Sequence, residues 1–128
     1  MDGMTEERML VRLECGGEML AARSYRAARE FYGSLVDAGG ARYRREALAG
    51  LAAAEDGIAG ELRAQLRDLE QSRVVVGAGV LLTPGDAGVV FSYLTAELRT
   101  EARNCEARAH RHREAADALG AGAADGSV

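Results

Sequence analysis

The chain has 128 residues with 20 acidic and 16 basic side chains, and 48% of its residues are hydrophobic. This length and composition predict one globular domain, and the net charge of −4 argues against nucleic acid as the main partner. Tryptophan is absent and aromatic residues make up 5% of the chain, so we expect a core of small and aliphatic side chains.

The first 72 residues contain apolar residues at the three- and four-residue spacing of amphipathic helices. Ser24 is a suitable N-cap for a second helix, the run Asp37–Gly40 is a stop signal, and Gly57 interrupts the pattern once more. This punctuation predicts four helices, over residues 5–22, 24–37, 41–56 and 58–72.

The second half of the chain begins with a Val- and Gly-rich segment, residues 73–82, whose apolar run fits either a strand or a short buried helix. A long helix is predicted over residues 87–119, followed by a disordered tail of Gly, Ala and Asp over residues 121–128. The sequence therefore predicts a mainly α fold. A single helical domain over residues 1–120 consists of helical hairpins and a long C-terminal helix, with one short β-hairpin around residues 73–91 as an alternative.

Cys15 and Cys105 lie far apart and form no CxxC motif. The first residues are charged and acidic, unlike the basic and then apolar start of a secretory signal. We therefore expect a cytoplasmic protein with two reduced thiols. The apolar run over residues 74–82 falls short of the about 20 residues of a membrane span, so we expect no membrane partner.

An echo at a spacing of 34 residues links residues 13–35 with residues 47–69 and aligns Gly16 with Gly50. Repeats of about this length, with small residues at fixed points, are typical of stacked helical hairpins. Residues 10–70 resemble two degenerate tetratricopeptide repeats. The match rests on Gly16, Tyr25, Ala28, Tyr32 and Leu35 in the first unit and on Gly50, Gly57, Ala59, Leu62, Leu66 and Leu69 in the second. The resemblance implies antiparallel helix pairs that bind another protein.

A rival resemblance covers residues 72–99. There, Gly79-Val80-Leu81-Leu82, a turn and the segment Tyr93–Arg99 are similar to the β-type subunits of prefoldin. That family implies a chaperone subunit in which a β-hairpin joins two coiled-coil helices and mediates assembly. Glycines throughout the first arm are unfavourable for a long coiled coil, because each interior glycine costs about 1 kcal/mol of helix stability.

Residues that could carry out chemistry form no convincing site. Glu106, His110 and Glu114 are spaced by four and would share a helix face, but a row on one helix needs a second element to complete a metal site. The sequence GAG at residues 77–79 lacks the third glycine and the βαβ context of a dinucleotide loop. We therefore expect no enzyme activity and neither a metal nor another cofactor.

The expected function is the non-enzymatic binding of another protein or of a second copy of this chain through helical hairpins, as an adaptor. The alternative is a prefoldin-like chaperone subunit. The candidate partner-binding residues are mostly aromatic or aliphatic, and lie either in the first hairpins or in and after the Val-rich segment: Tyr25, Phe31, Tyr32, Tyr43, Val80, Leu82, Phe91, Tyr93 and Leu94.

Overall fold

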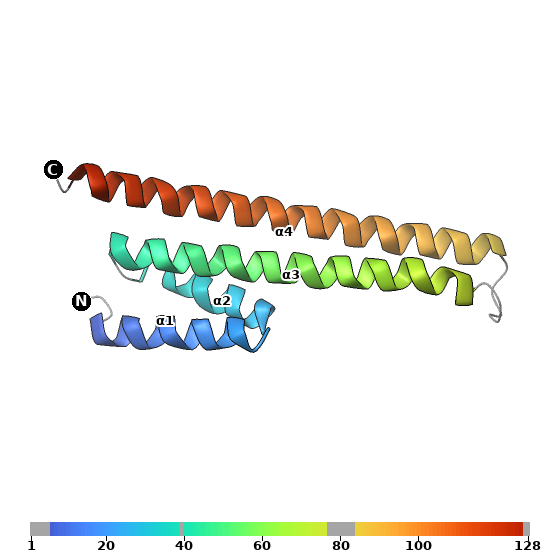
Figure 1. The fold of residues 1–128 in the computed structure, drawn as a ribbon, viewed down its shortest axis with the longest axis horizontal. Coiled ribbons are helices and arrows are strands. Elements are labelled where there is room, and N and C mark those ends of the chain that lie inside the picture. Colours follow the sequence, from blue (N-terminus) through green and yellow to red (C-terminus); the bar gives the residue numbers. More distant parts are fainter. Residues whose placement is uncertain (1–5, 39, 77–83, 127–128) are drawn as a thin grey trace.

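A computed structural model describes residues 6–38, 40–76 and 84–126 of the chain. Four helices account for almost all of them: α1 (Glu6–Ala21), α2 (Tyr25–Leu35), α3 (Ala41–Val76) and α4 (Pro84–Gly126). Figure 1 shows α3 and α4 as a long antiparallel hairpin, with α1 and α2 lying along only the first half of α3. The mainly α prediction, with helical hairpins and a long C-terminal helix, is confirmed.

The turn between α1 and α2 closes the first hairpin. The backbone N–H of Ser24 donates to the carbonyl of Met19, and that of Arg23 donates to the carbonyl of Leu20. This pairing is a Schellman motif, and Arg23 occupies its left-handed position with φ of 61°. Ser24 stands at the predicted N-cap position of α2, but its side chain makes no capping hydrogen bond.

The first hairpin is held to α3 by the Tyr32 ring, which lies between two glycines of different helices. An ideal Cβ atom on Gly16 of α1 would lie 2.5 Å from that ring, and one on Gly50 of α3 would lie 2.4 Å from it. Only glycine permits an approach this close, which accounts for a glycine inside a helix at both positions. Tyr32 is buried, and burial raises the pKa of its phenol.

The prediction of separate helices over residues 41–56 and 58–72 is wrong, because α3 runs unbroken from Ala41 to Val76. Gly57 does not end the helix. The Tyr25 ring of α2 covers it, and an ideal Cβ there would lie 2.3 Å from the ring. Packing against a neighbouring helix offsets the low helix propensity of glycine. The second hairpin therefore consists of α3 and α4 instead of two short helices.

The Val-rich segment is helical where the structure describes it. Residues 73–76 end α3 and residues 84–91 begin α4, so the alternative β-hairpin around residues 73–91 is absent from these two stretches. Residues 77–83, which include the candidates Val80 and Leu82, lie outside the described residues. α4 begins three residues before the predicted start and continues to Gly126, beyond the predicted end at residue 119. No helix in the described ranges is long and apolar enough to span a membrane.

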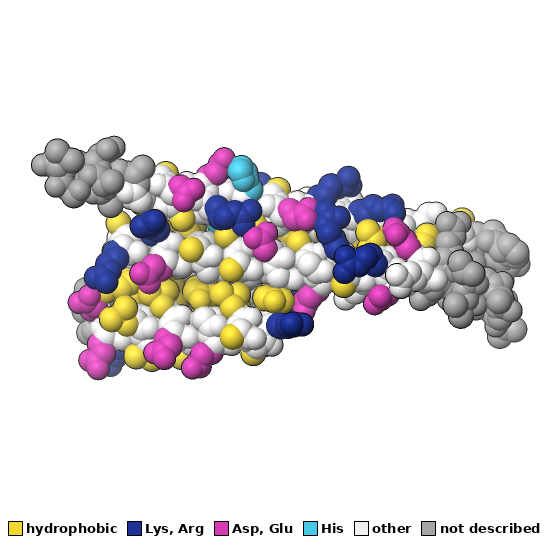
Figure 2. Space-filling model, viewed as in Figure 1, with side chains coloured by type: hydrophobic (Ala, Val, Ile, Leu, Met, Phe, Trp, Pro, Cys, Tyr) yellow, Lys and Arg dark blue, Asp and Glu magenta, His cyan; other side chains and the backbone are white. Residues whose placement is uncertain are grey.

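Two clusters of buried side chains form the core. The first joins α1, α2 and the start of α3 to the end of α4, through residues such as Met9, Leu35, Leu51 and Ala116. The second lies farther along the α3–α4 hairpin and centres on Ile58, Leu62, Ala102 and Cys105. Figure 2 shows hydrophobic side chains in a band between α1 and α3. The core is thus rich in alanine and aliphatic residues, as the composition predicts.

Candidate protein-binding surface

Three ion pairs join α3 to α4 at regular steps. Asp56 pairs with Arg113 at 2.5 Å, Arg63 with Glu106 at 2.6 Å and Glu70 with Arg99 at 2.9 Å. Successive pairs are seven residues apart on both helices, as in an antiparallel coiled coil. We call these pairs the charge ladder. Hydrogen bonds from the Arg63 guanidinium lower the pKa of the Glu106 carboxyl.

One carboxylate is buried where α2, α3 and α4 meet. Glu55 of α3 is 1% exposed, and its two oxygens accept hydrogen bonds from Arg29 of α2 and Arg108 of α4. Arg108 also donates to the Cys105 sulfur at 3.4 Å, and burial raises the pKa of this thiol. A buried charge needs such partners, so the cluster fixes the three helices relative to each other.

The α3–α4 hairpin has two halves with different surroundings. We call the part that α1 and α2 accompany, from Ala41 to Gly57 of α3, the proximal half. The distal half comprises α3 from Glu61 onward and the start of α4, up to Glu97. Figure 1 shows that neither α1 nor α2 extends along the distal half.

The distal half of α4 exposes a concentration of large apolar side chains. Val89 is 71% exposed and Tyr93 is 62% exposed, and Val90 and Leu94 beside them are also exposed. Among the residues whose side chains the structure describes, the other exposed large apolar ones are Leu10 and Val11 of α1. A helix that is apolar around most of its circumference is normally buried, so this part of α4 has the composition of an interface.

The aromatic candidates in the first half of the chain are occupied within the molecule. Tyr25 and Tyr32 pack on the glycines of α3, and Phe31 makes an edge-to-face contact with Tyr32 at 6.4 Å between ring centroids. The Tyr43 hydroxyl donates to Glu6 at 2.7 Å, which raises the pKa of the phenol, and Arg42 lies over its ring. These four residues hold α1 and α2 to α3.

The candidates on α4 lie together. Tyr93 and Leu94 are exposed neighbours, and Phe91, which precedes them on the same helix, is half-buried. The Tyr93 hydroxyl is hydrogen-bonded to Glu97, which raises the pKa of the phenol. Our sequence reasoning missed Val89 and Val90 as surface residues. The available signal was the absence of any charged residue between positions 87 and 96, which leaves α4 without a polar face.

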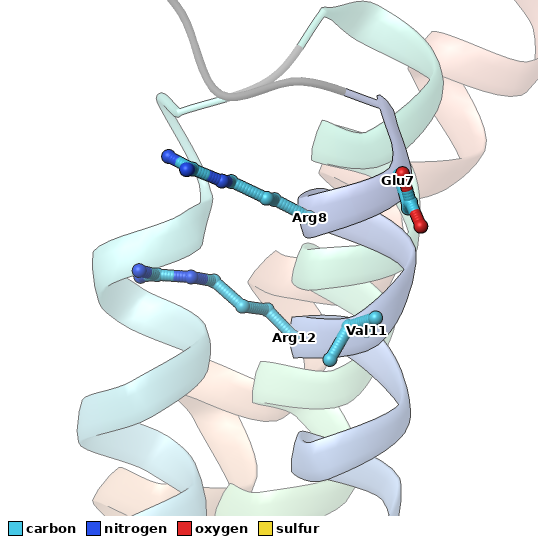
Figure 3. A pocket seen from close by; sticks show the side chains of 4 residues that line it. All are labelled: Glu7, Arg8, Val11 and Arg12. Atoms are coloured by element: carbon cyan, nitrogen blue, oxygen red, sulfur yellow. The ribbon is translucent and has the colours of Figure 1, made fainter.

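A hollow on the surface of α1 is also a candidate pocket. It encloses about 670 Å³ and is lined by Glu7, Arg8, Val11 and Arg12. Figure 3 shows the two arginines extending side by side toward α2 from successive turns, with Glu7 and Val11 away from them. All four side chains come from one exposed helix surface, which gives a shallow depression without a second wall.

The predicted row of possible metal ligands on α4 makes contacts with other side chains of the chain. Glu106 belongs to the charge ladder, and His110 lies 2.9 Å from Glu114. Among the described residues, no three His, Cys, Asp or Glu side chains come together as a metal site would require. Comparison of the chain with models of protein families, with curated proteins and with solved structures finds no match.

Proposed function

We propose that this chain is a non-enzymatic adaptor that binds another protein through the distal half of its α3–α4 hairpin. One observation carries the proposal: Val89, Val90, Tyr93 and Leu94 are exposed on the half of the hairpin along which neither α1 nor α2 lies. Apolar side chains in this number and proximity suit a protein contact, because burying them on a partner removes apolar surface from water.

The proximal half supports the same function by giving the surface a firm base. The buried Glu55 cluster and the Tyr32 ring fix α3 and α4 against the first hairpin. A site held on packed helices keeps its shape better than one on loops. The resemblance to tetratricopeptide repeats agrees with an adaptor, although the apolar surface now lies on α4 and not around Tyr32.

The test is affinity capture with the tagged full chain and two variants. We expect Val89→Ser combined with Tyr93→Ser to lose proteins that the unmodified chain captures. The matched control is Leu10→Ser combined with Val11→Ser, which removes the exposed apolar pair of α1. Equal recovery of the same proteins by both variants would refute a distal binding surface.

A prefoldin-like chaperone subunit is the second candidate. It is favoured by the length of α3 and α4, of 36 and 43 residues, and by the seven-residue steps of the charge ladder. This candidate requires stable assembly with other subunits and suppression of aggregation of an unfolded protein. Light scattering and an aggregation assay on the purified chain separate it from an adaptor. We place either function in the cytoplasm, since the exposed Cys15 and the buried Cys105 are free thiols.

A further inference from the structure

The face of the α3–α4 hairpin on which α2 lies continues into the distal half, beyond the N-terminal end of α2. The charge ladder shows that a step of seven residues along α3 or α4 returns to the same side of the hairpin. Residues seven positions beyond those that contact α2 therefore mark the continuation of that face into the distal half.

On α3, steps of seven residues toward the distal end lead from a buried apolar residue to two exposed acidic residues. Ala54 is fully buried in the core cluster that contains residues of α2. One step farther is Glu61 and two steps farther is Asp68, both exposed. Within the part of the chain that the structure describes, neither carboxylate forms an ion pair.

On α4, the same steps lead from α2-binding charges to apolar residues. Arg108 shares the Glu55 carboxylate with Arg29 of α2, and Glu101 lies 3.9 Å from Arg26 of α2. The next step toward the distal end is Leu94, which is exposed and has Val90 and Glu97 on the turns beside it. A hollow of about 450 Å³ adjoins this side of α4 and is lined by Glu97, Glu101, Tyr93, Ala96, Thr100 and Asn104.

The distal face is thus apolar along α4 and acidic on both sides, and consists of Glu61, Asp68, Val90, Leu94 and Glu97. In the proximal half, this face of the hairpin is covered by α2. α2 is amphipathic and presents two arginines to carboxylates of α3 and α4. The same chemistry recurs on the distal face, and no helix of the described ranges lies over it. The face is therefore complementary to a helix like α2.

We propose that the distal face binds a basic amphipathic helix of a partner protein, laid along the line of α2. Its apolar side chains contact Val90 and Leu94, and its arginine or lysine side chains pair with Glu61, Asp68 and Glu97. Helix-in-groove recognition of this kind uses anchors at three- and four-residue spacing. This inference rests on the proposed adaptor function and specifies the chemistry of the partner.

Two other occupants fit the charges less well. The exposed surface of α1 in a second copy carries Arg8 and Arg12, but the acidic residues Glu6, Glu7, Glu14 and Glu18 outnumber them, so its net charge has the same sign as that of the distal face. An anionic lipid surface would be repelled by the same carboxylates. The acidic flanks therefore select a basic protein segment.

The test uses a labelled synthetic peptide of leucine and arginine designed as an amphipathic helix of about 14 residues, or about 21 Å. Fluorescence anisotropy with the full chain should show binding that weakens as salt is added, because exposed charges are screened. A peptide with glutamate in place of every arginine should bind at least about tenfold more weakly, a difference of about 1.4 kcal/mol.

Two variants of equal charge change locate the binding. Glu61→Arg with Asp68→Arg should weaken binding of the arginine peptide by about tenfold or more. Glu14→Arg with Glu18→Arg, on the exposed side of α1, should leave it within about twofold. Leu94→Ser should weaken it with no change of charge. Thermal unfolding of each variant confirms that the fold is retained.

Equal weakening by the two charge variants would overturn the proposal, since the peptide would then respond only to net charge. So would a chain that dimerises through Leu94 by light scattering, or one that binds vesicles of phosphatidylserine more tightly than the peptide. If the distal face fails these tests while Tyr93→Ser with Val89→Ser still abolishes capture of cellular proteins, the adaptor function stands and only the basic helix is rejected.

Discussion

The proximal and distal halves of the α3–α4 hairpin are built from the same two helices but differ in where their apolar side chains lie. In the proximal half, small residues such as Gly50 and Ala54 are covered by α2, and the outer side of α4 carries charged residues such as Arg111 and Glu114. In the distal half α2 is gone, yet the outer side of α4 is apolar at Val89 and Tyr93.

This contrast shows that the exposed apolar side chains of the distal half are not explained by the core simply ending there. The distal half packs against fewer helices of the chain than the proximal half, yet its surface carries more large apolar side chains. Contact with water alone would favour polar side chains at such exposed positions. The acidic residues Glu61 and Asp68 lie on the α2 side of the same half. The proximal half therefore holds the hairpin to α1 and α2, and the distal half is the part that we propose binds a partner.

The largest predicted effect comes from the buried carboxylate of the proximal half. Arg29→Ala combined with Arg108→Ala leaves Glu55 buried without its two partners. We expect a loss of about 3–5 kcal/mol in the free energy of unfolding, measured by urea denaturation. Adding Glu55→Leu should recover most of it, because the unpaired charge is removed. A loss below about 1 kcal/mol would show that the cluster does not hold the proximal half together.

Gly50→Ala is expected to have the next largest effect. The new Cβ would overlap the Tyr32 ring, which Gly16 confines from the other side. We expect a loss of about 1–3 kcal/mol, despite the better helix propensity of alanine. The matched control is Gly60→Ala, where no atom lies within 4 Å of the new Cβ, and which should gain about 1 kcal/mol. Melting temperatures that move in the same direction would contradict this packing.

A pH-dependent effect is expected at His112 in the proximal half. Burial lowers the pKa of its imidazole below the ordinary value of 6.5. Below about pH 6.5, the unfolded chain takes up the proton more readily than the folded chain, so stability falls as the pH is lowered through this range. His112→Gln should flatten that part of the stability curve. His110→Gln, on the exposed side of α4, is the control and should retain the slope of the unmodified chain.

The smallest effect on stability is expected at the exposed apolar side chains of the distal half. Val89→Ser and Tyr93→Ser should each change the free energy of unfolding by no more than about 0.5 kcal/mol, because the side chains are already in water. Leu62→Ala, at a buried position of the neighbouring cluster, should cost about 2–5 kcal/mol. A comparable loss from Val89→Ser would mean that the distal surface is covered within the chain itself.

The sequence predicted the helical fold and the first two helices because their apolar spacing is regular and their punctuation is strong. It failed at Gly57, because the Tyr25 ring that stabilises this part of α3 comes from another helix. For residues 73–76 the pattern left strand and helix open, and they are helical as part of α3. A tertiary contact decided the case of Gly57.

The candidate surface was only partly predictable. Phe91, Tyr93 and Leu94 were identified as apolar residues of the last helix, and the structure places Tyr93 and Leu94 on the surface. Tyr25 and Tyr32 fit a binding groove equally well from spacing, but they pack onto glycines of neighbouring helices. The roles of Glu55, Glu61 and Asp68 depend on which helix lies beside each of them, and spacing along one helix does not contain that information.

The charge ladder also fixes the register of α4 on α3, and with it the position of the exposed apolar side chains of α4. Along α3 its signs run negative, positive, negative, from Asp56 through Arg63 to Glu70, and α4 carries the complementary order. If the two helices slid past each other by one seven-residue step, about 10 Å, Glu106 would face Asp56 or Glu70, and Arg63 would face another arginine. A shift of one step in either direction thus sets like charges against each other. By favouring one register, the charge ladder keeps the apolar start of α4 at a constant distance from α1 and α2.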